Sequence, residues 1–128
     1  MERKLSGREK KLLKKSRVKE LIEVYSGLLT DREKKILTLY TDPNMSGALI
    51  ARKLNVSRQA IHDHIRRAMG KMERCEARSN LVILRKKKIQ LLAQIEGILN
   101  SFSESIKDED KKKVKEALKL IEDLSKIV

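Results

Sequence analysis

Aromatic side chains are almost missing from this sequence: its 128 residues include no Trp, one Phe and two Tyr. Any hydrophobic core must therefore be built from aliphatic residues. A single Pro and five Gly provide few helix breakers, and no run of alternating β-branched residues predicts a strand. These absences favour an all-α fold.

Cysteine pairs and long apolar runs are missing as well. The lone Cys75 cannot form a disulfide within the chain, so we interpret it as a small packing residue. No apolar run reaches the length of about 18 residues that a membrane-spanning helix needs. Residues 1–20 are charged throughout, unlike a signal peptide. The sequence therefore predicts a cytoplasmic protein without membrane insertion.

Residue types that carry out catalysis are scarce. Two His, one Cys and no Gly-rich phosphate loop give no nucleophile beside a base and no metal-ligand spacing. No pair of carboxylates lies in an apolar setting. We therefore expect no enzyme activity, no cofactor and no metal.

Positive charge is what the sequence has in excess, with a formal net charge of +13. A charge of this size predicts a polyanionic partner, DNA or RNA before an anionic membrane surface. Charge alone fits a helical protein with Lys-rich faces equally well, so the pattern of motifs must decide.

Two packed helices are predicted before the most informative segment. Residues 18–29 carry apolar side chains on one helical face, and this helix should stop near Gly27. The apolar face consists of Val18, Leu21, Ile22, Tyr25, Leu28 and Leu29. Thr30 and Glu33 then have the spacing of a capping box, which predicts a new helix that residues 42–44 break.

Residues 45–72 have the pattern of a helix, a tight turn and a second helix. A short first helix should bury Ile50, Ala51 and Leu54, and the Asn55-Val56 pair makes the corner. Ser57 is a good N-cap, so the second helix should begin at Arg58. Its inward face is predicted to be Ile61, Ile65, Ala68 and Met72.

The outward face of that second helix is long, polar and rich in donors. Gln can pair with adenine and Arg with guanine, and a capped helix N-terminus suits a phosphate. We predict that Ser57 and Arg67 mainly position phosphates. The groups predicted to approach base edges are Gln59, His62, Asp63 and Arg66. Arg58 completes the predicted nucleic-acid-binding set.

This arrangement resembles the YlxM family of small bacterial helix-turn-helix proteins and, more distantly, region 4 of bacterial sigma factors. The resemblance covers roughly residues 20–100 and rests on the order of the matching pieces. These are Tyr25, Leu28-Leu29-Thr30, Leu39-Tyr40, Ile50-Ala51, Leu54 to Ile61, Asp63 and Ile65-Arg66-Arg67. The resemblance implies a protein encoded near the signal-recognition-particle GTPase that acts in, or regulates, that pathway.

One departure from the family pattern concerns the first helix of the motif. The family usually has an acidic residue three positions after the capping Ser, whereas Leu49 stands there after Ser46. The reciprocal half of a capping box is therefore lost, which predicts a looser first turn.

The C-terminal third is predicted to be helical and to associate. No Pro interrupts the chain between Met72 and Asn100, so the recognition helix and the tail should be nearly continuous. Apolar residues then repeat at coiled-coil spacing, broken at Lys88. This seam is Leu81, Leu84, Lys88, Leu91, Ile95, Ile98 and Phe102. A second stripe, after a polar break at residues 103–110, is Val114, Ala117, Leu118, Ile121, Leu124 and Ile127.

Two arrangements explain both stripes: an intramolecular hairpin of two antiparallel helices, or a homodimer. We expect a basic, flexible lead-in over residues 1–17, a helix-turn-helix domain over 18–78 and a helical association element over 79–128. The predicted function is nucleic-acid binding by a regulator, with DNA favoured over RNA. The alternative is an interaction module that binds signal-recognition-particle protein or RNA without an operator.

Overall fold

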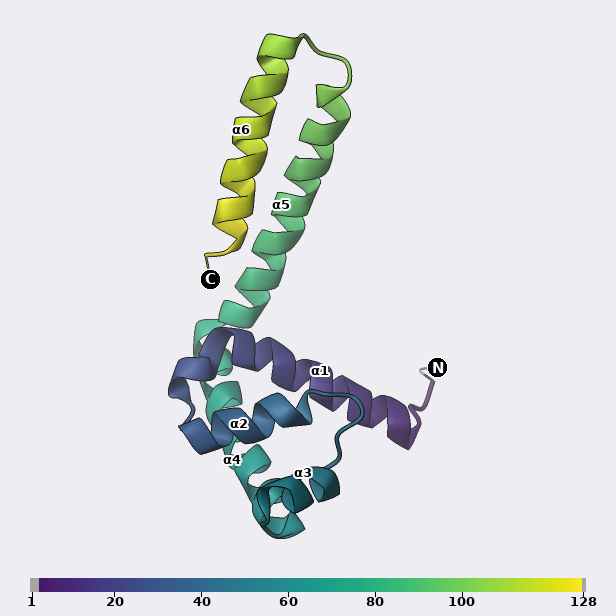
Figure 1. Ribbon diagram of the computed structural model, residues 1–128, viewed down its shortest axis with the longest axis vertical. Helices are drawn as coiled ribbons and strands as arrows, with labels where there is room; N and C mark the ends of the chain where they lie inside the picture. Colours follow the sequence, from purple (N-terminus) through teal and green to yellow (C-terminus); the bar gives the residue numbers. More distant parts are fainter. Residues whose placement is uncertain (1–2, 128) are drawn as a thin grey trace. The chain divides into compact units, whose positions relative to one another are not determined.

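The computed structural model describes residues 3–127, and all regular structure within that range is helical (Figure 1). The elements are α1 (Gly7–Tyr25), the 3-10 turn η1 (Ser26–Leu28), α2 (Asp31–Tyr40), α3 (Gly47–Leu54), α4 (Arg58–Ser79), α5 (Leu81–Ser103) and α6 (Asp108–Ser125). The all-α fold with a helix-turn-helix and a C-terminal helical extension is confirmed.

Side-chain caps define where the helices begin. The Glu33 amide donates to Thr30 Oγ1 at 3.1 Å and the Thr30 amide donates to Glu33 Oε1 at 2.9 Å, so the predicted capping box is present. Ser57 Oγ accepts from the Ala60 amide at 3.0 Å, which confirms the predicted start of α4. Such caps stabilise a helix by about 1 kcal/mol each.

The first turn of α3 keeps half of its cap. Ser46 Oγ accepts a hydrogen bond from the Leu49 amide at 3.1 Å, while Leu49 has no carboxylate to return one. The first half of the box therefore forms normally without its acidic partner.

The chain divides into two compact units, residues 1–80 and residues 81–128. In the first unit α1, α2 and α3 all pack against α4. Its most deeply buried side chains are Val18, Leu21, Ile36, Leu37, Ile50, Ile61 and Met72. This core is aliphatic, as expected from the shortage of aromatic residues.

Polar links join the helices of the first unit around that core. Arg17 donates to Glu73 through Nε at 2.7 Å and Nη2 at 3.1 Å, which ties α1 to α4. This interaction raises the pKa of Arg17, chiefly through the hydrogen bond to Glu73. Tyr25 on α1 donates to Glu76 on α4 at 2.7 Å. The orientation of α4 is thus fixed by hydrogen bonds as well as by packing.

The structure differs from the sequence-based expectations at the start of the chain. Residues 7–17, expected to form part of a flexible lead-in, are the first turns of α1, and Ser6 caps them. Leu28, expected on the packed face, is 45% exposed because the chain leaves the helix for η1.

The expected near-continuity of the recognition helix with the tail is interrupted at a single residue, Asn80. Asn80 has φ +55°, a left-handed conformation that ends α4 at Ser79. Asn tolerates this conformation better than most residues with a side chain. α5 begins at the next residue, Leu81. A local backbone conformation, invisible in the apolar spacing, therefore separates the two units.

In the second unit α5 and α6 lie side by side as an antiparallel hairpin (Figure 1). Lys107 stands at the N-cap position of α6 and makes no side-chain capping hydrogen bond. The hairpin does not use the coiled-coil seam of α5, which the first of the two alternatives had paired with the stripe on α6. Leu84, Leu91, Ile95, Ile98 and Phe102 are 45–69% exposed. We call these five residues the exposed α5 stripe.

The buried face of the hairpin lies one residue over from that stripe. Leu92 on α5 and Val114 on α6 are buried, and Leu99 and Leu118 are half-buried. Lys88, which interrupts the seam in the sequence, has its ammonium nitrogen buried with no hydrogen-bond partner among the described residues. The hairpin thus covers one apolar face and leaves a second one open.

Candidate nucleic-acid interface

The turn between α3 and α4 is short because one residue adopts a left-handed conformation. Asn55 has φ +55° and ψ +49°, and the Val56 amide donates back to the Ala51 carbonyl at 2.9 Å. Ser57 then caps α4. The predicted Asn55-Val56 corner is therefore confirmed, and it places the N-terminus of α4 directly after α3.

Packing of α4 separates its two faces. Ile61, Ile65, Ala68 and Met72 are buried, as the spacing predicts. The structure places the side chains of the predicted binding set on the remaining surface of α4. Arg58, Gln59, His62, Arg66 and Arg67 are exposed, whereas Asp63 is half-buried. The hydroxyl of Ser57, which is also exposed, is used in capping α4.

Asp63 connects two of the other polar groups on this face. Gln59 Nε2 donates to Asp63 Oδ1 at 3.2 Å, and Arg66 Nη2 lies 3.5 Å from the same oxygen. These pairs have the i, i+4 and i, i+3 spacings that bring side chains together on a helix. The carboxylate is therefore held between an amide and a guanidinium.

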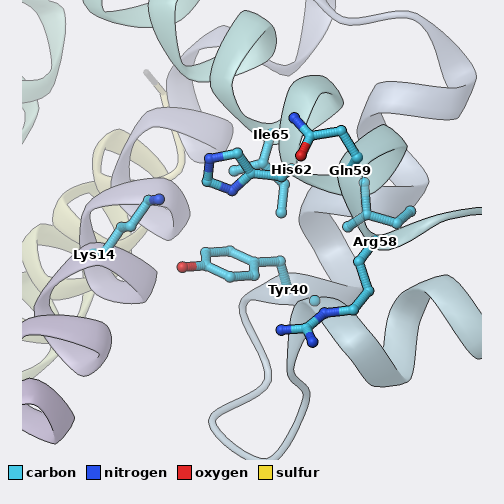
Figure 2. Close-up of a pocket in the computed structure, with 8 residues that line it drawn as sticks. Lys14, Tyr40, Arg58, Gln59, His62 and Ile65 are labelled. Carbon is cyan, nitrogen blue, oxygen red and sulfur yellow. The ribbon is translucent and has the colours of Figure 1, made fainter.

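A hollow of ≈ 390 Å³ lies beside the first two turns of α4 (Figure 2). Arg58, Gln59 and His62 border it from α4, Lys14 from α1 and Tyr40 from α2. The sequence analysis assigned no binding role to Tyr40 or Lys14. No local signal could have joined them to α4, because they meet it only through the packing of three helices.

Lys15, the neighbour of Lys14, has a structural role next to the hollow. Its ammonium nitrogen donates to the Asp42 carbonyl at 2.7 Å and to the Met45 carbonyl, closing the loop between α2 and α3. It also lies 4.9 Å from the Tyr40 ring centroid, within cation–π range. Burial lowers the pKa of Lys15, and the charge of Asp42 partly offsets this effect. Lys15 is therefore committed to the fold.

Lys14 and Tyr40 remain available to a ligand. Lys14 is exposed, with its nitrogen 5.9 Å from the Tyr40 ring centroid. Tyr40 lines the hollow but is otherwise buried, and this burial raises its pKa. The Tyr40 hydroxyl points toward the Lys14 side of the hollow (Figure 2).

The chemistry of this region is that of anion recognition. Side chains on the α4 face and around the hollow supply guanidinium, ammonium, amide, imidazole and phenol donors.

Among residues 3–127 no group of three or more His, Cys, Asp or Glu could hold a metal ion. No helix in the same range is long and apolar enough to cross a membrane.

Comparison with protein families matches residues 12–117 to the family UPF0122, described as "Putative helix-turn-helix protein, YlxM / p13 like". The chain belongs to the UPF0122 family. The match spans the helix-turn-helix and most of the C-terminal hairpin. The resemblance to the YlxM proteins inferred from the sequence is thereby confirmed.

Individual UPF0122 proteins agree with this assignment. One from Bacillus mycoides is 32% identical over 113 residues, covering 87% of this chain and 99% of that protein. One from Clostridium botulinum is 37% identical over 90 residues, or 69% of this chain and 82% of its own length. A relative from Lacticaseibacillus casei is 41% identical over 68 residues, or 53% and 60% of the two chains. No solved structure matches the chain.

Proposed function

We propose that this UPF0122 protein binds nucleic acid, duplex DNA before RNA, through the exposed face of α4, and acts as a regulator. The observation that carries the proposal is the exposed donor set on a capped second helix of a helix-turn-helix. Such a helix enters the major groove with its N-terminal residues at the base edges. Within that set Gln59, His62 and Arg66 are proposed to read bases, and Arg58, Arg67 and the Ser57 end of the helix to contact phosphates.

Charge supports this proposal. Residues 1–80 contain 20 Lys and Arg against 10 Asp and Glu, whereas residues 81–128 contain 11 against 8. The excess positive charge is therefore concentrated in the unit that contains the helix-turn-helix. A polyanion would be attracted to that unit rather than to the hairpin.

Asp63 is best assigned a positioning role. A bare carboxylate on the reading face would repel phosphates and would favour a protein partner instead. Arg66 and Gln59 engage this carboxylate, so it orders their side chains before binding. We therefore propose that Asp63 orients the two base-reading groups and does not itself contact a base.

The salt dependence of binding tests the proposed function. With about 5 phosphates neutralised, a plot of log K against log salt for duplex DNA should fall with a slope of about −4 to −5. No binding to DNA or RNA at low salt would eliminate the nucleic-acid function. Binding to signal-recognition-particle protein alone would then support the interaction-module alternative.

Three substitutions separate base reading from phosphate contact. Gln59→Ala and Arg66→Ala should each lower discrimination between a selected site and random DNA by ~1–3 kcal/mol. Arg67→Ala should weaken both alike. Arg32→Ala, at an exposed position of α2, controls for the loss of one positive charge away from α4. Equal losses on every sequence for Gln59→Ala and Arg66→Ala would mean that α4 contacts only the backbone.

We also propose that two copies associate through the exposed α5 stripe. Its residues repeat at coiled-coil spacing, and a monomer would leave them in water at a cost in free energy. An antiparallel pairing of two α5 helices would separate the basic run at residues 85–88 from its counterpart in the second copy. The hairpin and the dimer are then compatible rather than alternatives, because they use different faces of α5.

The link to the signal-recognition-particle pathway comes from the YlxM resemblance and is part of the proposal. Regulation of that pathway would require the α4 face to bind either an operator or the particle's RNA. Sequencing the nucleic acid recovered after cross-linking to the full chain in cells distinguishes these targets. Enrichment of one genomic site supports the operator, and enrichment of the particle's RNA supports the RNA target.

A further inference from the structure

The polar side chains that line the hollow beside α4 favour an anion. Lys14 and Arg58 supply positive charge. Gln59 supplies an amide group and His62 an imidazole ring, and no carboxylate lines the hollow. The first turn of α4 adds the positive end of a helix dipole. A phosphate group would therefore be favoured in this hollow.

The second observation is the hydroxyl of Tyr40. The residue is 9% exposed, and its hydroxyl forms no hydrogen bond with any residue of the described chain. The other tyrosine, Tyr25, donates to Glu76 at 2.7 Å. This unpaired hydroxyl opens onto the hollow on the side of Lys14, where it can donate a hydrogen bond to an acceptor on a ligand (Figure 2).

The hollow is larger than a phosphate alone would need. Its volume of ≈ 390 Å³ lies within the range of about 300–1,000 Å³ that is usual for small-molecule sites. Ile61 and Ile65 contribute apolar surface, and Tyr40 and His62 contribute rings. Aromatic rings and imidazoles are the surfaces on which proteins stack unpaired bases.

From these features we infer that the hollow binds one nucleotide unit, with the phosphate at Lys14 and the Tyr40 hydroxyl and the base against the exposed imidazole of His62 (Figure 2). The unit could be an unpaired nucleotide in the nucleic acid that α4 binds, or a free nucleotide. The first source rests on the proposed function and the second does not. Because Arg58, Gln59 and His62 serve both surfaces, a free nucleotide would compete with nucleic acid.

Two measurements on the full chain test this inference. The first is the affinity for a fully paired duplex and for the same duplex with one bulged nucleotide, as DNA and as RNA. The bulged form should bind about 5- to 100-fold more tightly, the range expected for stacking one base on an aromatic ring. The second is calorimetric titration with adenosine 5′-monophosphate, which should bind and displace the bulged duplex.

Matched variants connect these effects to the hollow. Tyr40→Phe keeps the ring and removes only the hydroxyl, so it should lower nucleotide affinity about 2- to 10-fold without unfolding the protein. Lys14→Gln should lower it as well. Lys10→Gln removes the same charge at an exposed position one turn earlier in α1. It should lower nucleotide affinity less, because Lys10 does not line the hollow.

The outcomes distinguish this inference from the proposed function. A bulge preference that Tyr40→Phe lowers and Lys10→Gln does not identifies the source as the nucleic acid. Binding of the monophosphate without a bulge preference identifies the ligand of the hollow as a free nucleotide. Equal binding of both duplexes together with no monophosphate binding overturns the inference and leaves the proposed function intact. Monophosphate binding without any duplex binding overturns the proposed function and leaves the site.

Discussion

The two units of the chain differ in how much of their apolar surface they bury. Four helices in residues 1–80 enclose a core in which residues such as Leu37 and Ile61 have no exposed surface. The two helices of residues 81–128 bury Leu92 and Val114 but leave the exposed α5 stripe in water. A pair of helices can cover one face of each helix, whereas α5 has apolar residues on two. The second unit therefore has a continuous apolar stripe on α5 that the hairpin itself does not cover.

The largest effect should follow from core truncation in the first unit. Leu37→Ala should lower the free energy of unfolding by about 2–5 kcal/mol, the range for emptying a fully buried Leu position. Leu124→Ala, at a residue of α6 that is 45% exposed, should cost well under half as much. Chemical denaturation measures both. Equal losses would mean that the hairpin is as tightly packed as the first unit.

Charge on the exposed α5 stripe should dissociate the proposed dimer while the hairpin stays folded. Ile95→Asp with Ile98→Asp should weaken self-association on the order of 100-fold, since each buried Ile contributes about 1.5–3 kcal/mol. Sedimentation measures the effect, and circular dichroism should show unchanged helicity. Leu92→Asp, aimed at the buried face, should instead reduce helicity. A wild-type protein that sediments as a monomer at high concentration refutes the proposed dimer.

Acid should weaken the first unit through Glu33. Burial alone would raise the pKa of Glu33, but hydrogen bonds from Lys71 and Thr30 hold it below its ordinary value. The ionised Glu33 carboxylate therefore contributes fully to the free energy of unfolding above the pKa of about 4.3 that it has in the unfolded chain. This contribution is lost as the pH falls through the lower pKa of the folded protein.

Glu33→Gln should accordingly lower the free energy of unfolding by about 1 kcal/mol at neutral pH and by less at pH 3. This figure is reduced for solvent screening, because Lys71 is partly exposed. Urea titrations at the two pH values measure this difference. Lys111→Gln, which removes an exposed ion pair in the hairpin, should leave stability unchanged at both. A cost for Glu33→Gln that does not depend on pH would mean that its charge is not what stabilises the fold.

The smallest effect should come from Asn80. Its positive φ suits Gly at least as well as Asn, so Asn80→Gly should change the free energy of unfolding by less than about 0.5 kcal/mol. Asn80→Ala should cost about 1 kcal/mol, because a side chain without a local hydrogen-bonding group is strained there. Thermal melts of the two variants provide the comparison. If Ala is tolerated as well as Gly, α4 and α5 can join as one helix without loss.

Local features of the fold could be predicted from the sequence. The caps at Thr30 and Ser57 and the corner at Asn55 depend on residues within four positions of one another, and these predictions are confirmed. The inward face of α4 was predicted for the same reason, since it follows from spacing alone. The binding roles of the outward residues stay predictions.

Features that depend on distant residues could not be predicted. The hydrogen bonds from Lys15 join residues 27 and 30 positions apart, and no pattern in the sequence marks such a partner. Spacing showed that α5 is apolar but not which of its two apolar faces meets α6, because the choice depends on the packing of the whole hairpin. The hollow at Lys14 and Tyr40 was missed because it exists only after α1, α2 and α4 have packed.

The positions of the two tyrosines have a spectroscopic consequence. The chain has no Trp, and Tyr25 and Tyr40 both lie in residues 1–80, where each is enclosed. Tyrosine fluorescence and near-ultraviolet dichroism therefore report mainly on the first unit, whereas far-ultraviolet dichroism reports on helices throughout the chain. A hairpin that melts earlier would be visible as a loss of far-ultraviolet signal while the tyrosine signal holds. The native chain can thus show whether its two units unfold together without any added probe.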